Sequence, residues 1–524
     1  MLHEQDDERF VSLGDRIRDH ARVMPNRRAF VCDGLSIDYA TLVERADACA
    51  AQLQADGFVA GSDRRVGILS LNSIDFAVMI VACQFAGVAF VPLPGLMTPD
   101  ALARMLQDAN ILALFHDPDH AERADAAARL AGAVSMIPMA SAGESIRTAL
   151  DAWAGNAPAF EPVVIDPDWS SDFIYSSGTT GVPKGIVQSF AARAGSAESL
   201  ARIGIGDGVV LLHTVGLYSN YGMIGYLLAL WWGGSFFTMR KFSPDYCIHV
   251  LRDEKVDTCW VAPATLLRLL AHPDFDAVAL DAPCVKLCAG APLSAAHKQT
   301  ILEIWPGSFF DLYGQTETGT ITLHAIHSAP PEKLASVGTL LPTATVHILD
   351  DDGHALPPGT EGEIAACTST MMTGYHARAD AEAATYWTDP EGRKFVRTGD
   401  VGKLDEDGFL WLCDRKKDMI ISGGYNVFPA DIERVFQDHG AVFEVAVVGF
   451  PSTKWGETPV AFVTLREGQA VDADELQAWV NCRVASIQRV ASVMIVTSLP
   501  NGSMGKILKR ELRETYRGEF ATLL

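Results

Sequence analysis

An order of apolar helix, glycine and apolar strand occurs twice in the first half of the chain. Residues 74–85 are almost all apolar, so they predict a buried helix with Asn72 as its cap and Gly87 at its end. Residues 88–91 then predict a buried strand. Residues 221–239 repeat the order, with a glycine pair between helix and strand. Because each αβ unit needs a partner layer over its apolar surface, we predict two similar sheets packed together.

Shorter apolar runs predict further strands of these sheets. They cover residues 65–70, 256–261 and 285–288. A hairpin is predicted over residues 29–37, followed by a helix that Asp38 opens. The strands end at glycine, proline or polar residues, and ligands of open α/β sheets bind at such carboxyl ends.

The pattern changes after about residue 335. Short β runs separated by Asp- and Gly-rich turns are typical of a small antiparallel barrel; they span residues 345–349, 362–366 and 409–412. From Lys417 onward helical and β patterns mix, and basic and acidic residues nearly balance. We therefore predict an α/β fold with a large N-terminal domain over residues 1–416, made of two packed αβ sheets plus a small β-barrel. A smaller α+β C-terminal domain follows over residues 417–524.

Charge and cysteine usage narrow the function. Lys and Arg number 42 against 65 Asp and Glu, a net charge of −23 that argues against nucleic acid and anionic membrane surfaces as partners. Ten cysteines occur without a CxxC pair, which predicts reduced thiols in a cytoplasm and no zinc site. No apolar signal segment opens the chain, and Gly233-Gly234 splits the uncharged run 221–239, so we predict no membrane span.

The strongest local signal is the stretch Tyr-Ser-Ser-Gly-Thr-Thr-Gly-Val-Pro-Lys-Gly at residues 175–185. Glycines let backbone N–H groups approach an anion, hydroxyls donate to its oxygens, and Lys184 offsets its charge. Pro183 before this lysine and Gly185 after it depart from the Walker pattern, in which Ser or Thr follows the lysine. Apolar runs on both sides predict strand–loop–strand. We predict a phosphate-binding loop; the alternative is a flexible Ser/Gly loop.

A second candidate is the turn over residues 312–319. Tyr313 offers a face on which a nucleobase can stack, and Glu317 offers an oxygen ligand for Mg²⁺. Three later stretches add charged groups, each of which alone is also typical of an ordinary polar loop: Thr398–Asp400, Asp414–Asp418 and Pro500–Lys506.

Taken in this order, the motifs resemble those of the adenylate-forming enzymes, in the branch of acyl-CoA synthetases and aryl-acid–CoA ligases. The resemblance runs from about residue 87 to Lys506. It implies an enzyme that joins a carboxylic acid to ATP, releasing pyrophosphate, and then transfers the acyl group to coenzyme A, releasing AMP. ATP, Mg²⁺ and coenzyme A are the implied cofactors and co-substrates.

The resemblance also implies roles for individual residues around the nucleotide. The β- and γ-phosphates would be wrapped by Ser176, Ser177, Gly178, Thr179, Thr180, Gly181 and Lys184. Adenine would pack between Tyr313-Gly314 and the segment of Gly290, Ala291 and Pro292. The remaining implied roles are contact with the α-phosphate for Thr316, Mg²⁺ binding for Glu317 with Thr180, ribose binding for Asp400 and Arg415, and bridging of carboxylate and α-phosphate for Lys506.

The acid pocket is implied to be lined by His213, Trp260, Ala289, Leu312, Gly314, Gly319 and Thr320. His213 stands where relatives often have a histidine near the carboxylate, although a buried core histidine is an alternative. Tyr218 and Tyr221 could also project inward. A tryptophan opposite small residues favours an aromatic or medium-chain aliphatic acid.

For the second step, the resemblance implies a mobile C-terminal domain that rotates about Lys417. The rotation would withdraw Lys506 and bring the loop of Gly423 and Gly424 over the site, where two glycines leave room for a pantetheine arm. Trp455 and the basic run 506–513 are further candidates for contact with coenzyme A.

Several alternatives stay open. The same fold can load a carrier protein instead of coenzyme A, or bind a nucleotide without catalysis, and a luciferase-like oxygenase is a more distant option. An amino acid substrate would need an acidic partner for its ammonium group, and Asp207 and Asp245 are not convincingly placed for it. A homodimer also stays open.

Overall fold

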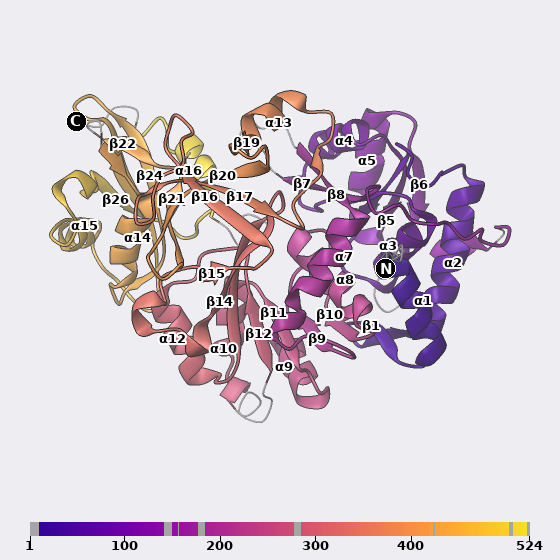
Figure 1. The fold of residues 1–524 in the computed structure, drawn as a ribbon. Helices are drawn as coiled ribbons and strands as arrows, with labels where there is room; N and C mark the ends of the chain where they lie inside the picture. The colour runs from indigo at the N-terminus through magenta and orange to yellow at the C-terminus, as the bar shows by residue number, and fades with distance from the viewer. Residues whose placement is uncertain are drawn as a thin grey trace, which may run out of the picture. The chain divides into compact units, whose positions relative to one another are not determined.

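The computed structural model describes residues 10–140, 149–155, 157–176, 184–276, 284–416, 418–422, 425–501 and 507–520. The chain forms two compact units (Figure 1). Unit 1 contains Met1–Ala289, Gln299–Ser328 and Cys367–Tyr386, and unit 2 contains Gly290–Lys298, Ala329–Ala366 and Trp387–Leu524. Most of the β-rich segment that follows residue 335 thus groups with the C-terminal part. A functional boundary after Lys416 stays a prediction.

The first sheet of unit 1 has the strand order β18-β8-β7-β4-β3-β5-β6. Its strands are β3 (Arg65–Leu69), β4 (Phe90–Pro92), β5 (Ile111–His116), β6 (Ser135–Pro138), β7 (Ser170–Ser176), β8 (Lys184–Ser189) and β18 (Gly374–Tyr375). The pairs from β7 to β6 are parallel, whereas β7–β8 and β8–β18 are antiparallel.

The second sheet of unit 1 has the order β14-β13-β12-β11-β9-β10-β1-β2. Its strands are β1 (Arg28–Cys32), β2 (Leu35–Asp38), β9 (Val210–His213), β10 (Ser235–Thr238), β11 (Thr258–Val261), β12 (Val285–Cys288), β13 (Phe309–Gln315) and β14 (Gly319–Ala325). Antiparallel hairpins close both ends of a parallel centre.

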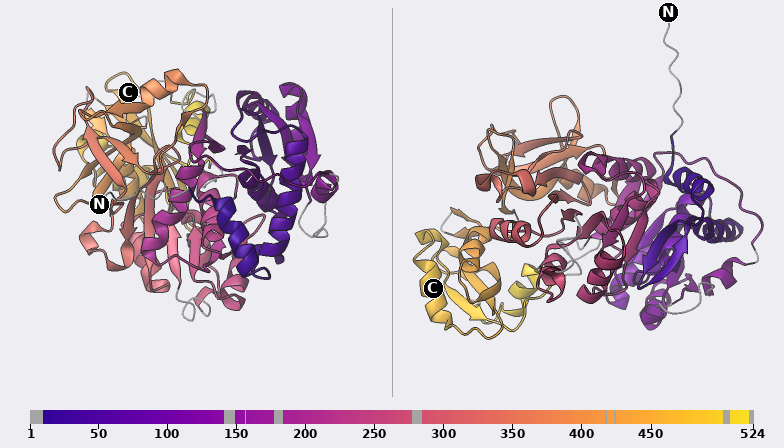
Figure 2. Two further views of the ribbon diagram at one scale, coloured as in Figure 1. Left: turned by 45° about the vertical axis from the view of Figure 1, so that its right-hand side comes forward. Right: turned by 90° about the horizontal axis from the view of Figure 1, so that it is seen from below.

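Helices cover these sheets (Figures 1 and 2). Those of unit 1 are α1 (Leu13–Val23), α2 (Tyr39–Ala55), α3 (Ile74–Ala86), α4 (Pro99–Asp108), α5 (Ala121–Ala131), α6 (Ala149–Ala154), α7 (Phe190–Ser199), α8 (Asn220–Trp231), α9 (Pro244–Asp253), α10 (Pro263–Leu270) and α13 (Ala379–Thr385), while α12 (Ala295–Ile304) has residues in both units. Short 3-10 turns are η1 (Pro118–His120), η2 (Leu200–Ile203), η3 (Ile326–Ser328), η4 (Pro331–Lys333) and η5 (Ser486–Gln488).

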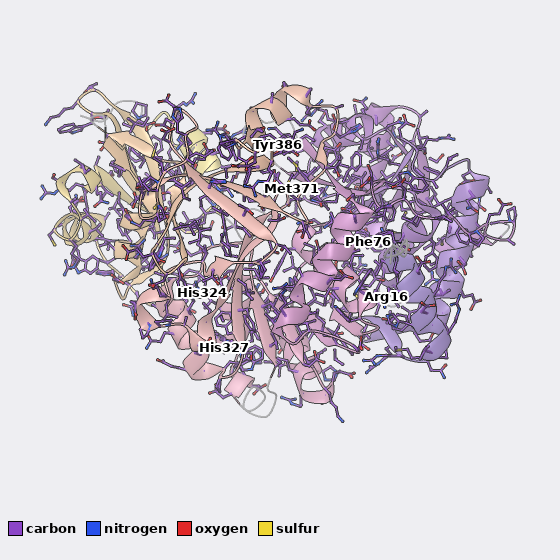
Figure 3. The ribbon with its side chains drawn as sticks, in the orientation of Figure 1. Arg16, Phe76, His324, His327, Met371 and Tyr386 are labelled. Atoms are coloured by element: carbon purple, nitrogen blue, oxygen red, sulfur yellow. The ribbon has the colours of Figure 1, made fainter. Side chains whose placement is uncertain are left out.

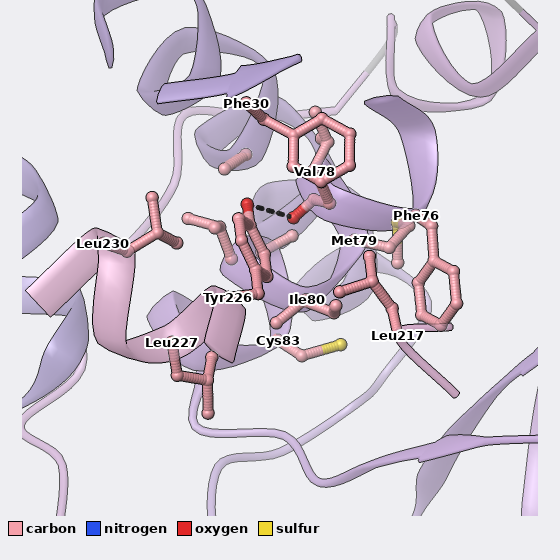
Figure 4. Close-up of a cluster of buried hydrophobic side chains, with 14 of the residues drawn as sticks. Phe30, Phe76, Val78, Met79, Ile80, Cys83, Leu217, Tyr226, Leu227 and Leu230 are labelled. Atoms are coloured by element: carbon pink, nitrogen blue, oxygen red, sulfur yellow. Dashed lines mark hydrogen bonds between the residues drawn. The ribbon is translucent and has the colours of Figure 1, made fainter. Parts of the chain in front are cut away.

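The two sheets of unit 1 share one hydrophobic core through α3 and α8. Every residue of α3 after Ile74 is buried, as expected of a helix that is apolar on all sides. The core joins Phe90 of the first sheet to Phe236 of the second, and Phe76 lies within it (Figure 3). Tyr226 of α8 donates a hydrogen bond of 3.3 Å to the Ala77 carbonyl of α3 (Figure 4). Packed sheets are therefore confirmed.

The predicted repeat is also confirmed. Both α3 and α8 lead through a glycine in the left-handed region, with φ of +63° at Gly87 and +61° at Gly233, into a parallel strand. The predicted cap is wrong: Ser73, not Asn72, caps α3. Asn72 is buried, and its amide nitrogen donates to Thr238 Oγ1 at 2.9 Å, so its side chain links the two sheets instead.

Unit 2 contains two smaller sheets. The first has the strand order β16-β17-β20-β19, and β21 pairs with β20. Its strands are β16 (Ala344–Leu349), β17 (Gly362–Thr368), β19 (Tyr386–Thr388), β20 (Lys394–Leu404) and β21 (Leu410–Arg415). Its described pairings form an open sheet where a small barrel was predicted. The two-residue strand β15 (Thr339–Leu340) precedes it.

The second sheet of unit 2 has the order β23-β22-β25-β24, with β26 beside β25. Its elements are β22 (Ile420–Ser422), β23 (Tyr425–Val427), β24 (Val442–Ser452), β25 (Gly456–Leu465) and β26 (Ser492–Ile495), together with α14 (Pro429–Gln437), α15 (Ala473–Asn481) and α16 (Lys509–Thr515). This is the predicted α+β part. Across the described part of the chain, no helix combines the length and the apolar character needed to cross a membrane. All ten cysteines are free thiols.

Candidate active site

The β13–β14 hairpin forms a tight turn over residues 316–318. The Gln315 N–H donates to Thr318 Oγ1 at 3.0 Å across the turn. Gly319 has φ of +68°, and a Cβ atom there would lie 2.2 Å from Thr370 Oγ1, so this position requires glycine. The predicted glycine-rich turn is thus a hairpin tip that carries Thr316 and Glu317.

Three hydrogen bonds hold the backbone carbonyls of this turn. They run from the Gln188 side-chain amide to Thr316 (2.7 Å), from the Met372 N–H to Glu317 (2.8 Å), and from the Thr368 hydroxyl to Thr318 (2.5 Å). Two of these donors, Thr368 and Met372, lie in the segment that contains Met371 (Figure 3). The turn is therefore fixed by its own protein contacts, which is the preorganisation that an electrostatic site needs.

Tyr375 contacts two of the predicted ligand-binding groups. Its hydroxyl donates to Glu317 Oε1 at 3.0 Å, and the Lys184 ammonium lies 4.9 Å from the centre of its ring. Burial, and next the charge of Glu317, raise the pKa of Tyr375 above its usual range. The phenol therefore stays protonated and keeps its role as donor.

The strands predicted to flank the candidate phosphate loop are confirmed. Ser176 ends β7, Lys184 begins β8, and the two residues pair across the hairpin. Nine predicted site residues lie outside the described part of the chain, so their placement stays a prediction: Ser177, Gly178, Thr179, Thr180, Gly181, Lys417, Gly423, Gly424 and Lys506.

Asp108, at the end of α4, anchors the base of this loop. One carboxylate oxygen accepts from the Tyr175 hydroxyl at 2.6 Å, and the other accepts from Arg378 Nη2 at 2.6 Å. The sequence pointed to neither Asp108 nor Arg378 nor Tyr375. Asp108 and Arg378 stand 270 residues apart, and no spacing rule links such positions.

The residues predicted to line the acid pocket meet at one edge of the second sheet. They stand at or near the carboxyl ends of neighbouring parallel strands: His213 on β9, Trp260 on β11, Ala289 after β12, and Leu312 and Gly314 on β13. Gly319 and Thr320 open β14, in the same hairpin. The edge is where ligands of α/β sheets bind.

An aromatic cluster dominates this edge. The Trp260 ring lies 5.9 Å from the ring of His213 and 5.1 Å from that of Tyr221, which comes from the first turn of α8. Tyr221 donates to the Val261 carbonyl at 3.1 Å, so its hydroxyl is engaged within the protein. Tyr218, the second tyrosine named as able to project inward, has its ring beside Gly216, where a Cβ atom would lie 2.3 Å from Tyr218 Cε1.

His213 has no exposed surface, and burial lowers its pKa to about 3. It is therefore neutral at pH 7. Within the described structure, His213 Nε2 and Trp260 Nε1 are buried polar atoms without a hydrogen-bond partner. A Cβ atom on Gly225 would lie 2.8 Å from His213 Nε2, so a glycine in α8 makes room for the imidazole.

In unit 2, Asp400 and Arg415 face each other on β20 and β21. Arg415 Nε lies 2.8 Å from Asp400 Oδ1, and the Asp400 N–H donates to Thr398 Oγ1 at 3.1 Å. The two predicted ribose-binding residues are thus neighbours. Gly290, Ala291 and Pro292 follow β12 and belong to unit 2, so their packing against adenine beside Tyr313 stays a prediction.

Comparisons with known proteins agree with this arrangement. Residues 17–376 match the family model of AMP-binding enzymes, and residues 431–506 match that of the AMP-binding enzyme C-terminal domain. A fatty acid–[acyl-carrier-protein] ligase of Streptomyces coeruleorubidus is 30% identical over 521 residues, covering 96% of each chain. A feruloyl-CoA synthase of an Amycolatopsis species is 32% identical over 501 residues, covering 95% of this chain and 97% of that one.

Solved structures give the same result. ATP-bound MatB from Rhodopseudomonas palustris superposes with a TM-score of 0.86 at 26% identity, covering 97% of this chain and 100% of that chain. The o-succinylbenzoate CoA synthetase of Bacillus subtilis, in complex with its acyl-adenylate, has a TM-score of 0.81 at 26% identity and coverages of 95% and 97%. The chain belongs to the AMP-binding enzyme family, the adenylate-forming group that its motifs resemble, and it is an AMP-forming acid–thiol ligase.

Proposed function

We propose that this protein is an ATP-dependent carboxylic acid–CoA ligase. It joins an acid to ATP, giving acyl-adenylate and pyrophosphate, and then transfers the acyl group to the thiol of coenzyme A, giving acyl-CoA and AMP. The observation that carries the proposal is the fixed β13–β14 turn, on which Glu317 is held by Tyr375 while Lys184 lies over the same ring.

The chemistry needs such an arrangement because both reactants are anions. An acid–ATP condensation is accelerated by charge neutralisation and in-line positioning. A carboxylate on a fixed turn beside bound phosphates suits Mg²⁺, which takes few protein ligands and several phosphate oxygens. Glu317 with Thr180 would hold that ion, which would neutralise phosphate charge. Thr316 and Lys506 would contact the α-phosphate.

Ribose and adenine have matching groups. Asp400 can accept hydrogen bonds from the two ribose hydroxyls, and Arg415 holds that carboxylate in place at 2.8 Å. Tyr313 and the Gly290–Pro292 segment would sandwich the base. The loop of residues 176–184 would grip the β- and γ-phosphates, which leave as pyrophosphate.

The acid is proposed to be aromatic or medium-chain aliphatic. The cluster of His213, Trp260 and Tyr221 supports a flat, apolar site. Relatives are named for feruloyl, o-succinylbenzoate and fatty acid substrates, which include both aromatic and aliphatic acids. Neutral His213 would act near the carboxylate by hydrogen bonding and not by charge.

Coenzyme A is the proposed thiol. Trp455, between β24 and β25, is 46% exposed, and the Lys454 ammonium lies 4.7 Å from its ring. The indole ring would stack on the base of coenzyme A, and the ammonium would bind a phosphate. The carrier-protein alternative is favoured by one observation, the 30% identity to a fatty acid–[acyl-carrier-protein] ligase. We place the reaction in the cytoplasm because all ten cysteines are free thiols.

The test is pyrophosphate release by the purified full-length protein. A panel of cinnamic, benzoic, arylacetic and C6–C12 fatty acids is assayed with MgATP, each with coenzyme A, with a phosphopantetheinylated carrier protein, or with neither. We expect release with at least one aromatic or medium-chain acid, and acyl-CoA as the product when coenzyme A is present. A rate that no acid stimulates would refute the proposal, and acyl transfer to the carrier alone would select the alternative.

A further inference from the structure

Tyr375 is the meeting point of two charges that the proposed reaction uses. Its hydroxyl is 3.0 Å from Glu317 Oε1 and its ring centre is 4.9 Å from Lys184 Nζ. One side chain therefore offers separate places to a carboxylate and to an ammonium group. The first lies on the β13–β14 turn, the second at the exit of the phosphate loop.

The position of Tyr375 is fixed by two independent contacts and by burial. It pairs with Ile186 as the edge strand β18 lies antiparallel beside β8, the strand that Lys184 begins. The Tyr375 N–H donates to Glu382 Oε1 at 2.8 Å. The residue is 8% exposed. A ring that the fold fixes in this way can hold the side chains that contact it in one orientation.

The energetics favour a role in orientation. A hydrogen bond from a neutral hydroxyl to a carboxylate is among the stronger side-chain contacts, and a cation over a tyrosine face is favourable although weaker. Both contacts leave part of the charged group available, since a carboxylate accepts several hydrogen bonds and an ammonium donates three. Tyr375 thus contacts Glu317 and Lys184 through two different parts of its side chain.

We propose that Tyr375 is a positioning residue, which sets Glu317 for Mg²⁺ and Lys184 for the phosphates before MgATP binds. The inference rests on the proposed function. A purely structural tyrosine would instead stabilise the fold and leave nucleotide binding unchanged.

Equilibrium binding separates the two roles. Calorimetric titration of full-length protein with ATP, without acid, is done once with excess Mg²⁺ and once with EDTA; the ratio of the two dissociation constants measures the gain from Mg²⁺. Tyr375→Phe keeps the ring for Lys184 and removes the hydroxyl that holds Glu317. We expect it to reduce the gain from Mg²⁺ about three- to tenfold and to leave the dissociation constant in EDTA unchanged.

A second variant tests the ring. Tyr375→Leu removes both contacts, so we expect it to lower the gain from Mg²⁺ as the phenylalanine variant does. It should also weaken ATP binding in EDTA about twofold to fivefold. Tyr226→Phe is the matched control, because it removes a buried tyrosine hydroxyl that bonds the Ala77 carbonyl in the core. It should change neither constant.

The path through Glu317 is tested in a double-mutant cycle. In the Glu317→Ala background, the further change Tyr375→Phe should leave the gain from Mg²⁺ unaltered, because the carboxylate it acts through is gone. Additive effects of the two changes would overturn the inference. So would a phenylalanine variant with the wild-type gain, or a loss that Tyr226→Phe reproduces.

Failure of the proposed function has a different signature. If the wild-type protein binds no ATP with or without Mg²⁺, the function itself is refuted. If it binds MgATP and the Tyr375 variants bind equally well, only the positioning role is refuted.

Discussion

His213 ends β9 with an imidazole that has no exposed surface, and this burial lowers its pKa to about 3. In the unfolded chain the same group titrates near pH 6.5. Below about pH 6.5 the unfolded state binds a proton that the folded state does not bind. The contribution of His213 to the free energy of unfolding is therefore fully present above about pH 6.5 and falls as the pH drops towards 3. We expect acidification from pH 7.5 to 5 to lower the free energy of unfolding of the wild type by about 2 kcal/mol more than that of His213→Gln. Urea unfolding at both pH values measures the difference. The matched control is His249→Gln, at a histidine side chain 66% exposed on α9, which should follow the wild type at both pH values. A gap between wild type and His213→Gln that does not change with pH would show that the imidazole is not held neutral by burial.

At the scale of elements, Asp108 ties the C-terminal end of α4 to β7 and to the chain that follows β18. Asp108→Ala would leave the half-buried Arg378 guanidinium and the buried Tyr175 hydroxyl without this acceptor. We expect a loss of about 1–3 kcal/mol in the free energy of unfolding and a several-fold rise in KM for ATP, since Tyr175 leads into the phosphate loop. Asp125→Ala, which breaks the exposed Arg129 pair within α5, is the control and should cost less than Asp108→Ala does. Equal losses in the two variants would mean that Asp108 has no special anchoring role.

The same elements show what a sequence can and cannot predict. Helix α3, strand β12 and the strand–loop–strand around residues 175–185 were predictable because their signals are local: an apolar run, a glycine stop, a turn composition. The contacts of Tyr375 and Asp108 were not, because they join segments that only the sheet topology brings together. Asn72 was assigned as a helix cap for the same reason, since its partner Thr238 lies 166 residues away.

At the scale of the whole molecule, we propose that the two half-reactions use two arrangements of one chain, and two lysines outside the described residues test this proposal. Lys506 is proposed to offset the negative charge that develops on the α-phosphate. Lys506→Ala removes this positive charge, so the rate of acyl-adenylate formation should fall about 10²–10³-fold. Thioester formation from supplied acyl-adenylate should persist. Lys417→Pro fixes φ near −65° at the proposed hinge, so the opposite result is expected, with adenylate formed and the thioester step lost. Lys417→Ala removes the same charge but keeps the rotation, and should retain both steps. Rapid-quench assays measure the rate of each half-reaction for the wild type and the three variants. Equal loss of both steps in both blocked variants would show that a single arrangement performs the whole reaction. A reciprocal pattern means that the chain changes its arrangement between the two steps.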